Sequence, residues 1–260
     1  MIHTDLQSAH IVLLDLLKNF ASICQKHNLT YWLDSGTLLG AVRHQGFIPW
    51  DDDIDVAMPT ADYLKFLSIA KKELPKNIFL QTKQTDPSVI TKIVKLRNVN
   101  SLAIGYDDAF ERPYHKGISL DIFEFIQYPK IPKWGIKFFC KMLQRTYSVL
   151  TRKHRLTLKT TLQYLVFSVE RCIFTPLWKL CCRFKSDKYI GNVIEQNVYK
   201  IRHRNAYIFP VVPILFEGEY FSAPQDSDAY LKTLYGNYMQ LPPEDHRVQH
   251  NIINITDIKD

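Results

Sequence analysis

The chain has 260 residues, of which 46% are hydrophobic and 23% are charged, and its formal net charge is +7. This composition is ordinary for a folded protein and excludes extensive disorder, and the length suits one sizeable core with an insertion or two small domains. The five cysteines are odd in number and form no Cys-x-x-Cys pair, so they fit neither a disulfide framework nor a zinc site and favour reduced thiols in the cytosol. We expect no signal peptide and no membrane-spanning helix.

The positive charge is concentrated in one part of the chain. Residues 130–188 hold fourteen Lys or Arg and two acids, a net of +12, which leaves −5 for the rest. The distribution predicts an acidic catalytic body that carries a basic insert.

The first predicted elements are a helix and a strand. Thr4 and Gln7 form a capping box, and apolar residues then recur at spacings of three and four, which predicts an amphipathic helix to about His27. Residues 31–33 are predicted to form a strand, residues 34–36 a tight turn, and residues 37–43 the start of a helix.

This turn resembles a phosphate-binding site. Gly36 would let backbone N–H groups approach a phosphate, and a helix N-terminus adds positive potential there. Ser35 and Thr37 could donate hydroxyl hydrogen bonds. Arg43 or His44, just after the helix, could offset charge in a transition state.

Four aspartates follow within five positions: Asp51, Asp52, Asp53 and Asp55. On a strand, Asp51, Asp53 and Asp55 would share one face while Asp52 points away. Such close carboxylates repel one another unless a cation lies among them, and oxygen ligands favour Mg²⁺ or Mn²⁺. The alternative is a solvated acidic turn, which the apolar residues around the cluster disfavour.

The next segments are a predicted helix over residues 61–74 and strands over residues 78–82 and 90–97. The basic residues of this region either bind a donor phosphate or face solvent: Lys92, Lys95 and Arg97. In residues 118–123 the side chains of Ile118, Leu120 and Ile122 would face one side of a strand, and those of Ser119, Asp121 and Phe123 the other. This pattern places Asp121 in a strand that looks buried. A buried carboxylate is costly unless paired, so Asp121 either shares a metal with Asp53 and Asp55 or caps a loop in the core.

Residues 130–188 are predicted to be helical and basic. Cations at every fourth position line one helix face, opposite apolar side chains: Lys133, Lys137, Lys141 and Arg145. Such a helix suits an anionic membrane surface, although it could also pack on the core or bind nucleic acid. Pro176 is expected to break a second apolar helix.

The last part is predicted to contain a hairpin over residues 216–221 and a helix over residues 228–235. His246, Arg247 and His250 could contact a phosphate or a base, although a lone histidine is more often a surface residue. Residues 252–260 are expected to be loosely ordered.

Residues 31–57 resemble the signature of the LicD family, which is related to the fukutin-related proteins and, more distantly, to the nucleotidyltransferase superfamily of DNA polymerase beta. The resemblance is strong over residues 31–63 and returns at residues 117–125 and 230–243, but it is weak or absent over about 130–190. It implies an α/β (α+β) fold with a nucleotidyltransferase-like mixed sheet and flanking helices. The expected parts are a catalytic core (1–129), a basic amphipathic helical insertion (130–190) and a C-terminal part that packs back on the core (191–260).

The resemblance also implies an activity, the transfer of phosphocholine from CDP-choline to a hydroxyl of a cell-surface glycan of the lipopolysaccharide, capsule or teichoic-acid type, with release of CMP. Asp53, Asp55 and Asp121 would be the catalytic carboxylates. Together with Asp51 they would hold Mg²⁺ or Mn²⁺, while Ser35, Gly36, Thr37, Arg43 and His44 would hold the donor. Candidates for an aromatic cage around choline, by composition, are Trp50, Tyr106, Phe110 and Tyr114.

The expected location is cytoplasmic and peripheral, on the inner face of the cell membrane, with an anionic membrane surface as a partner and no nucleic acid. Two alternatives stay open. A metal-dependent glycosyltransferase that uses a nucleotide-sugar also has an Asp-x-Asp motif, although the Ser-Gly turn ahead of the acids argues against it. A non-catalytic protein that binds membrane or nucleic acid is the other, although the three carboxylates argue against a loss of catalysis.

Overall fold

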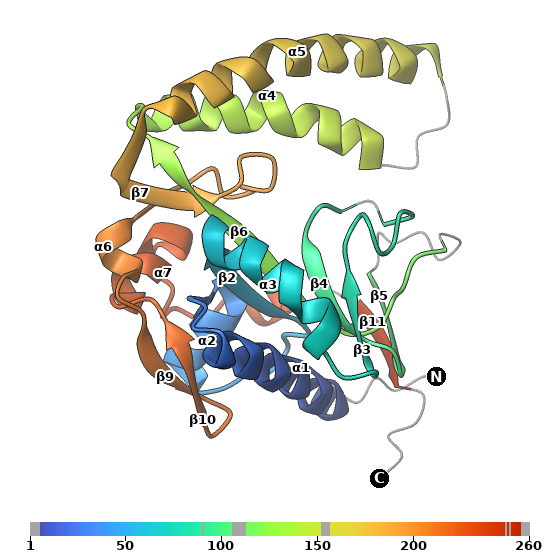
Figure 1. Ribbon diagram of the computed structural model, residues 1–260, viewed down its shortest axis with the longest axis vertical. Helices are drawn as coiled ribbons and strands as arrows, with labels where there is room; N and C mark the ends of the chain where they lie inside the picture. The colour runs from blue at the N-terminus through green and yellow to red at the C-terminus, as the bar shows by residue number, and fades with distance from the viewer. Residues whose placement is uncertain are drawn as a thin grey trace. The chain divides into compact units, whose positions relative to one another are not determined.

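The computed structural model describes residues 6–89, 91–105, 113–151, 157–247, 249 and 251–255 (Figure 1). The chain forms two compact units, of which the first comprises residues 1–124 and 208–260 and the second comprises residues 125–207. The three-part division at residues 129 and 190 stays a prediction.

The helices of the first unit begin with α1 (Leu6–Lys26), α2 (Ser35–His44) and α3 (Thr60–Glu73). α1 buries the predicted apolar face, and Phe20 on α1 meets Phe66 on α3 with ring centres 5.0 Å apart. These two helices cover one face of the sheet (Figure 1). Thr4 of the expected capping box lies outside the described residues.

The main sheet of the first unit has the strand order β1-β2-β6-β4-β3. The bounds are β1 (Trp32–Leu33), β2 (Ile54–Pro59), β3 (Ile78–Gln81), β4 (Val94–Asn98) and β6 (Ser119–Pro129), the last of which continues into the second unit. Ile118, Leu120 and Ile122 are buried, as their alternation predicts. Helices and a sheet of this kind confirm the expected α/β (α+β) class.

The C-terminal part of the chain adds two smaller strand pairs. β9 (Val212–Phe216) and β10 (Glu219–Ala223) form an antiparallel hairpin, and α7 (Ser227–Tyr235) follows it, so both predictions there are confirmed. A short 3-10 helix, Glu244–His246, comes next. The expectation for residues 252–260 is wrong in part, because β11 (Asn251–Ile255) pairs with β5 (Ser101–Gly105). That ladder satisfies the backbone groups of residues 251–255.

The second unit contains α4 (Lys133–Thr151), α5 (Leu158–Arg183), β7 (Lys185–Asn192) and β8 (His203–Arg204), after which α6 (Asn205–Ile208) leads back to the first unit. Its core gathers Tyr128, Ile136, Cys140, Leu143, Trp178 and Ile194. The apolar side of α4 therefore packs inside the unit, while Lys133, Lys137 and Lys141 are exposed. No helix among the described residues is long and apolar enough to cross a membrane.

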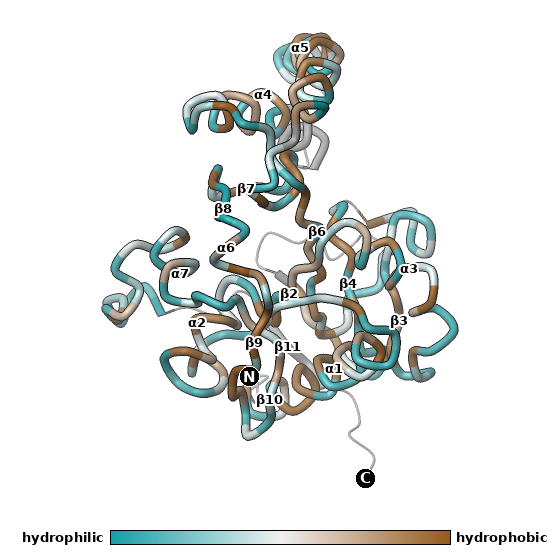
Figure 2. Tube along the Cα trace, turned by 60° about the vertical axis from the view of Figure 1, so that its left-hand side comes forward, coloured by the Kyte–Doolittle hydropathy of each residue, from teal (hydrophilic) through white to brown (hydrophobic). Residues whose placement is uncertain are grey.

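The expected break at Pro176 is wrong, because α5 continues through this residue. A proline inside a helix removes one backbone hydrogen bond. Here aromatic contacts on either side of the proline hold the helix together: Phe174 meets Phe138 at 5.2 Å, and Trp178 meets Tyr128 at 5.4 Å. Figure 2 shows both hydrophobic and hydrophilic residues on α5.

Candidate active site

The start of α2 is hydrogen-bonded to β2 at Asp55. The backbone N–H of Asp34 donates to the carbonyl of Asp55 at 2.9 Å, and the N–H of Asp55 donates to Thr37 Oγ1 at 2.8 Å. These two bonds fix the helix N-terminus beside the aspartate strand. The buried Thr37 hydroxyl thus accepts a bond from the backbone.

The expected turn over residues 34–36 is wrong, because α2 already begins at Ser35. Asp34 is its N-cap, and its Oδ1 accepts from the Ser35 N–H at 2.8 Å, which satisfies a donor that the helix leaves open. Ser35 has a φ of 47°, a left-handed conformation that is unusual for a residue other than glycine. Such backbone strain is often found at functional sites.

Gly36 lies directly against Asp51. A Cβ at this position would be 2.7 Å from Asp51 Oδ2, so only glycine lets the carboxylate come this close. The structure therefore gives Gly36 a contact within the acidic cluster. That Ser35, Gly36 and Thr37 bind a donor phosphate stays a prediction.

The aspartates differ from the expected arrangement on a strand. β2 begins at Ile54, so Asp51, Asp52 and Asp53 lie in the segment that leads into it, and Asp55 alone of the four is in the strand. Asp52 is buried, 3% exposed, and does not point to solvent. The alternative of a solvated acidic turn is therefore wrong.

These carboxyl groups lie in a shared and unfavourable electrostatic environment. Burial, followed by the charge of Asp52, raises the pKa of Asp51 to about 6. Burial, followed by the charges of Asp51 and Asp121, raises the pKa of Asp53 to about 8. Burial and the charges of Asp53 and Asp121 raise the pKa of Asp55 well above its ordinary range. The structure thus brings together all four predicted carboxylates: Asp51, Asp53, Asp55 and Asp121.

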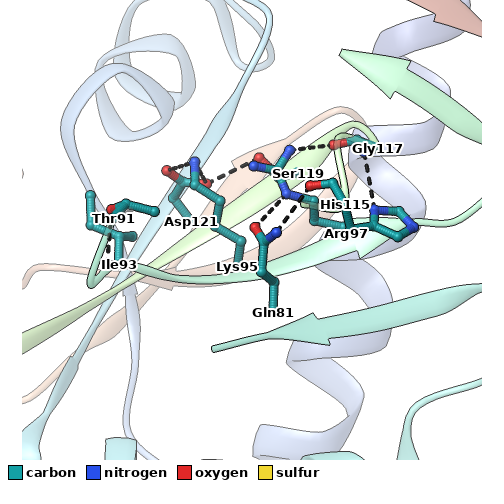
Figure 3. Close-up of polar contacts among 9 residues, drawn as sticks. All are labelled: Gln81, Thr91, Ile93, Lys95, Arg97, His115, Gly117, Ser119 and Asp121. Atoms are coloured by element: carbon teal, nitrogen blue, oxygen red, sulfur yellow. Dashed lines mark hydrogen bonds and ion pairs between the residues drawn. The ribbon is translucent and has the colours of Figure 1, made fainter. Parts of the chain in front are cut away.

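Asp121 reaches this cluster from β6. In the register of the sheet it lies opposite Lys95 of β4, whose Nζ is 2.8 and 2.6 Å from the two carboxylate oxygens. Ser119 Oγ donates to Asp121 Oδ1 at 3.2 Å (Figure 3). The role of Asp121 as a loop cap is therefore wrong, because its carboxylate is held by Lys95 and Ser119.

The donor set of this cluster suits a hard cation. Carboxylate oxygens are the ligands that Mg²⁺ and Mn²⁺ prefer, and an ion would relieve the repulsion that raises the pKa values of Asp53 and Asp55. In the described part of the chain, however, no three Asp, Glu, His or Cys side chains are placed to enclose an ion together. The residues thus fit a metal in their chemistry, without forming a closed cage.

Arg97 has a structural role, which corrects both interpretations of this residue. It is buried, its Nε donates to Gln81 Oε1 at 2.6 Å, and its Nη1 donates to the carbonyl of Gly117 at 2.6 Å (Figure 3). Gln81 in turn donates to Asp86 at 2.8 Å. This network joins β3, β4 and the start of β6. Lys92 is exposed.

A group of basic residues includes Arg43, His44 and Arg247. Arg43 donates to His44 Nε2 at 2.9 Å and to the carbonyl of Tyr238 at 3.2 Å. Burial and then the charge of Arg247 lower the pKa of Arg43, and burial and then Arg43 lower the pKa of His44. Arg247 lies 5.2 Å from the centre of the Trp50 ring, next to Asp51 in sequence.

The rings of two aromatic residues expected to surround choline are each already in contact with a cationic side chain of the protein. Arg247 lies over Trp50, and Lys116 Nζ is 4.1 Å from the centre of the Tyr114 ring. Tyr106, Phe110 and His250 lie outside the described residues, and His246 is exposed. The choline cage stays a prediction.

Sequence reasoning missed a buried partner of the cluster. Tyr230 on α7 donates to Asp34 Oδ1 at 2.6 Å, and Trp32 Nε1 donates to the Tyr230 hydroxyl at 3.3 Å. Burial raises the pKa of Asp34 to about 6, although both of its hydrogen bonds lower it, and its charge helps to raise the pKa of Asp55. Only the N-cap role of Asp34 had a local signal, since an Asp just before a helix start is a preferred N-cap.

The part of the chain that holds this cluster matches known proteins in sequence. Residues 28–136 match the model of the LicD/FKTN/FKRP nucleotidyltransferase domain, a range that contains all four predicted carboxylates. The resemblance to the LicD family is therefore confirmed, and it is carried by residues 28–136.

Individual relatives match over different lengths. The chain is 27% identical over 262 residues to the lipopolysaccharide cholinephosphotransferase LicD of Haemophilus influenzae, which covers 95% of this chain and 96% of that protein. It is 42% identical over 40 residues to the human ribitol 5-phosphate transferase FKRP, which is 15% of this chain and 8% of that protein. An uncharacterized protein of Rickettsia typhi is 49% identical over 57 residues, 22% of this chain and 18% of its own length.

Proposed function

We propose that this chain is a phosphotransferase that acts on a cell-surface glycan, and that it moves phosphocholine from CDP-choline to a glycan hydroxyl with release of CMP. The observation that carries the proposal is the cluster of largely desolvated, mutually repelling carboxyl groups beside the N-terminus of α2. Support also comes from the Haemophilus influenzae relative, a cholinephosphotransferase, which matches almost the whole chain.

The residues of the cluster would hold a divalent cation. Asp51, Asp53, Asp55 and Asp121 would bind Mg²⁺ or Mn²⁺, which when bound neutralises charge on the donor diphosphate and the leaving group. The backbone N–H of Gly36 and the hydroxyls of Ser35 and Thr37 would hold donor phosphate, because a helix N-terminus favours anions. Arg43, with His44, would offset the remaining negative charge.

The transfer step requires one proton acceptor. The acceptor hydroxyl oxygen attacks the choline-bearing phosphorus, a new P–O bond forms, and the P–O bond to CMP breaks. Asp121 would take the hydroxyl proton, and Lys95 and Ser119 would orient its carboxylate. CMP leaves with the electrons of the broken bond.

We further propose a cytoplasmic location on the inner face of the cell membrane. The five cysteines are all free thiols, which suits a reducing compartment. The nucleotide-activated donor and the glycan acceptor would meet at that face.

The test incubates the purified full chain with CDP-choline and, in parallel, with UDP-sugars, in the presence of Mg²⁺ and membrane-derived glycolipid, and it measures which donor is turned over. The proposal predicts CMP release from CDP-choline and choline on the glycan. Turnover of UDP-sugars alone would instead identify a glycosyltransferase. Salt-sensitive nucleic-acid binding without any nucleotide turnover would identify a binding protein.

A further inference from the structure

α5 presents a line of exposed apolar residues. Residues separated by three or four positions share one helix face, and six of them form what we call the α5 stripe: Leu162, Leu165, Val169, Ile173, Leu177 and Leu180. Their exposed fractions run from 44% for Leu177 to 64% for Leu162. A row of large apolar side chains this long is unusual on a surface that only meets water.

The stripe is not needed to hold the second unit together. The opposite side of α5 carries Phe174 and Trp178, which pack on Phe138 and Phe139 of α4 with ring centres 5.2 Å apart in both pairs. α5 thus uses one face for its own core and presents a second apolar face outward.

The charge around the stripe indicates its partner. α4 and α5 together contain eight Lys or Arg and one acid, Glu170, which is 3.4 Å from Arg145. Lys159 lies three positions before Leu162, and Arg183 lies three positions after Leu180, so a cation lies at each end of the stripe on the same helix face.

We propose that the α5 stripe is a docking surface for an anionic lipid bilayer, in which α5 lies parallel to the membrane with the stripe among the acyl chains and its cations at the headgroups. An apolar face bounded by cations is the pattern of interfacial helices. A second copy of the chain fits less well, because the two basic helix pairs would repel each other. This inference does not depend on the proposed transfer reaction.

The membrane-binding helix inferred from the structure differs from the one that the sequence favoured. The basic row of α4 was expected to bind the membrane with the apolar side of the same helix, but that side is buried in the core at Ile136, Cys140 and Leu143. The apolar contact comes from α5 instead.

The experiment measures cosedimentation of the full chain with vesicles of phosphatidylcholine alone or with 30 mol% phosphatidylglycerol. We expect binding to the anionic vesicles, which high salt weakens, and weak binding to the neutral ones. Leu165→Ser with Ile173→Ser should lower the partition coefficient at least about tenfold, because two apolar side chains no longer insert. Lys159→Gln with Arg183→Gln should lower it about fivefold per charge, on anionic vesicles only.

The matched control is Ile11→Ser with Leu64→Ser in the first unit. These residues are 64% and 57% exposed, against 57% and 52% for Leu165 and Ile173, so the change in surface chemistry is equal. The control variant should bind as the wild type does, and circular dichroism should show both variants folded.

The inference would be overturned if the wild type failed to sediment with anionic vesicles. It would also be overturned if the stripe variant bound the vesicles as well as the control variant does. If sedimentation equilibrium shows that the wild type is a dimer and the stripe variant a monomer, while vesicle binding is the same for both, the stripe is an interface between two copies of the chain. Because binding is measured without substrate, failure of the transfer assay would leave this result unaffected.

Discussion

At the scale of single residues, a substitution at the close contact between Gly36 and Asp51 should lower activity without lowering stability. In Gly36→Ala the new methyl would meet the end of the Asp51 side chain at 2.7 Å, so the carboxylate must move. Alanine favours a helix over glycine by about 1 kcal/mol, so α2 should hold. We expect kcat/KM for CMP release to fall at least about tenfold, with the melting temperature nearly unchanged.

The control for this change is another helical glycine with room for a methyl. At Gly135 in α4 the nearest atom to a Cβ would be Ile131 Cδ1 at 3.5 Å, an ordinary contact. Gly135→Ala should keep full activity. Equal kcat/KM values for both variants would show that the position of Asp51 does not matter.

His203 predicts how the stability of the second unit depends on pH. It is buried beside Phe125, and burial lowers its pKa to about 3. The unfolded chain therefore binds a proton below about pH 6.5 that the folded chain does not, so stability falls as pH falls from that value toward 3. The slope from this group is about 1.4 kcal/mol per pH unit.

The measurement is urea denaturation between pH 4 and pH 7, for the wild type and for His203→Gln, which cannot titrate there. The variant should lose this part of the slope, whatever its stability at pH 7. Parallel curves for the two proteins would contradict the assignment.

At the scale of elements, one buried hydrogen bond links α7 to the start of α2. In Tyr230→Phe the carboxylate of Asp34 loses its 2.6 Å bond and keeps the Ser35 N–H. Removing a donor from a buried charged group costs roughly 2 kcal/mol. We expect the free energy of unfolding of the first unit to fall by about that amount.

Tyr238→Phe is the matched control, because its hydroxyl donates to the exposed Asp228 at 2.9 Å. Water can replace that bond, so the loss should stay below about 1 kcal/mol. Equal losses in the two variants would mean that burial of Asp34 does not set the strength of its bond.

The elements that sequence could predict are those with local patterns. Alternation located the strand around Asp121, and the β9–β10 hairpin and α7 were also expected close to where they lie. The continuation of α5 through Pro176 depends on contacts with Phe138 and Tyr128, which are distant in sequence. A local rule for proline cannot include them.

The same reasoning applies to the site. The acidic run and Asp121 could be singled out by residue type and spacing, and they do gather. The Lys95–Asp121 pair could not, because it follows from the register of β4 on β6. The bond between Tyr230 and Asp34 also could not, since 196 positions separate these residues.

At the scale of the whole molecule, the two units carry different properties. The first unit holds the aspartate cluster, and the second holds the basic helix pair with the α5 stripe. Transfer from a soluble donor to a membrane-bound acceptor would require a catalytic site and a membrane-binding surface. The proposed function assigns the catalytic site to the first unit, and the membrane inference assigns the membrane-binding surface to the second.

The most direct test of the central claim is CMP release from CDP-choline, with membrane-derived glycolipid, by the wild type and by Asp53→Asn. We predict release that depends on Mg²⁺ and stops with EDTA, and a fall of at least about a hundredfold in the variant, while the exposed-site control Asp228→Asn stays active. Release that EDTA leaves unchanged, or full activity in Asp53→Asn, would contradict the role of the carboxylate cluster.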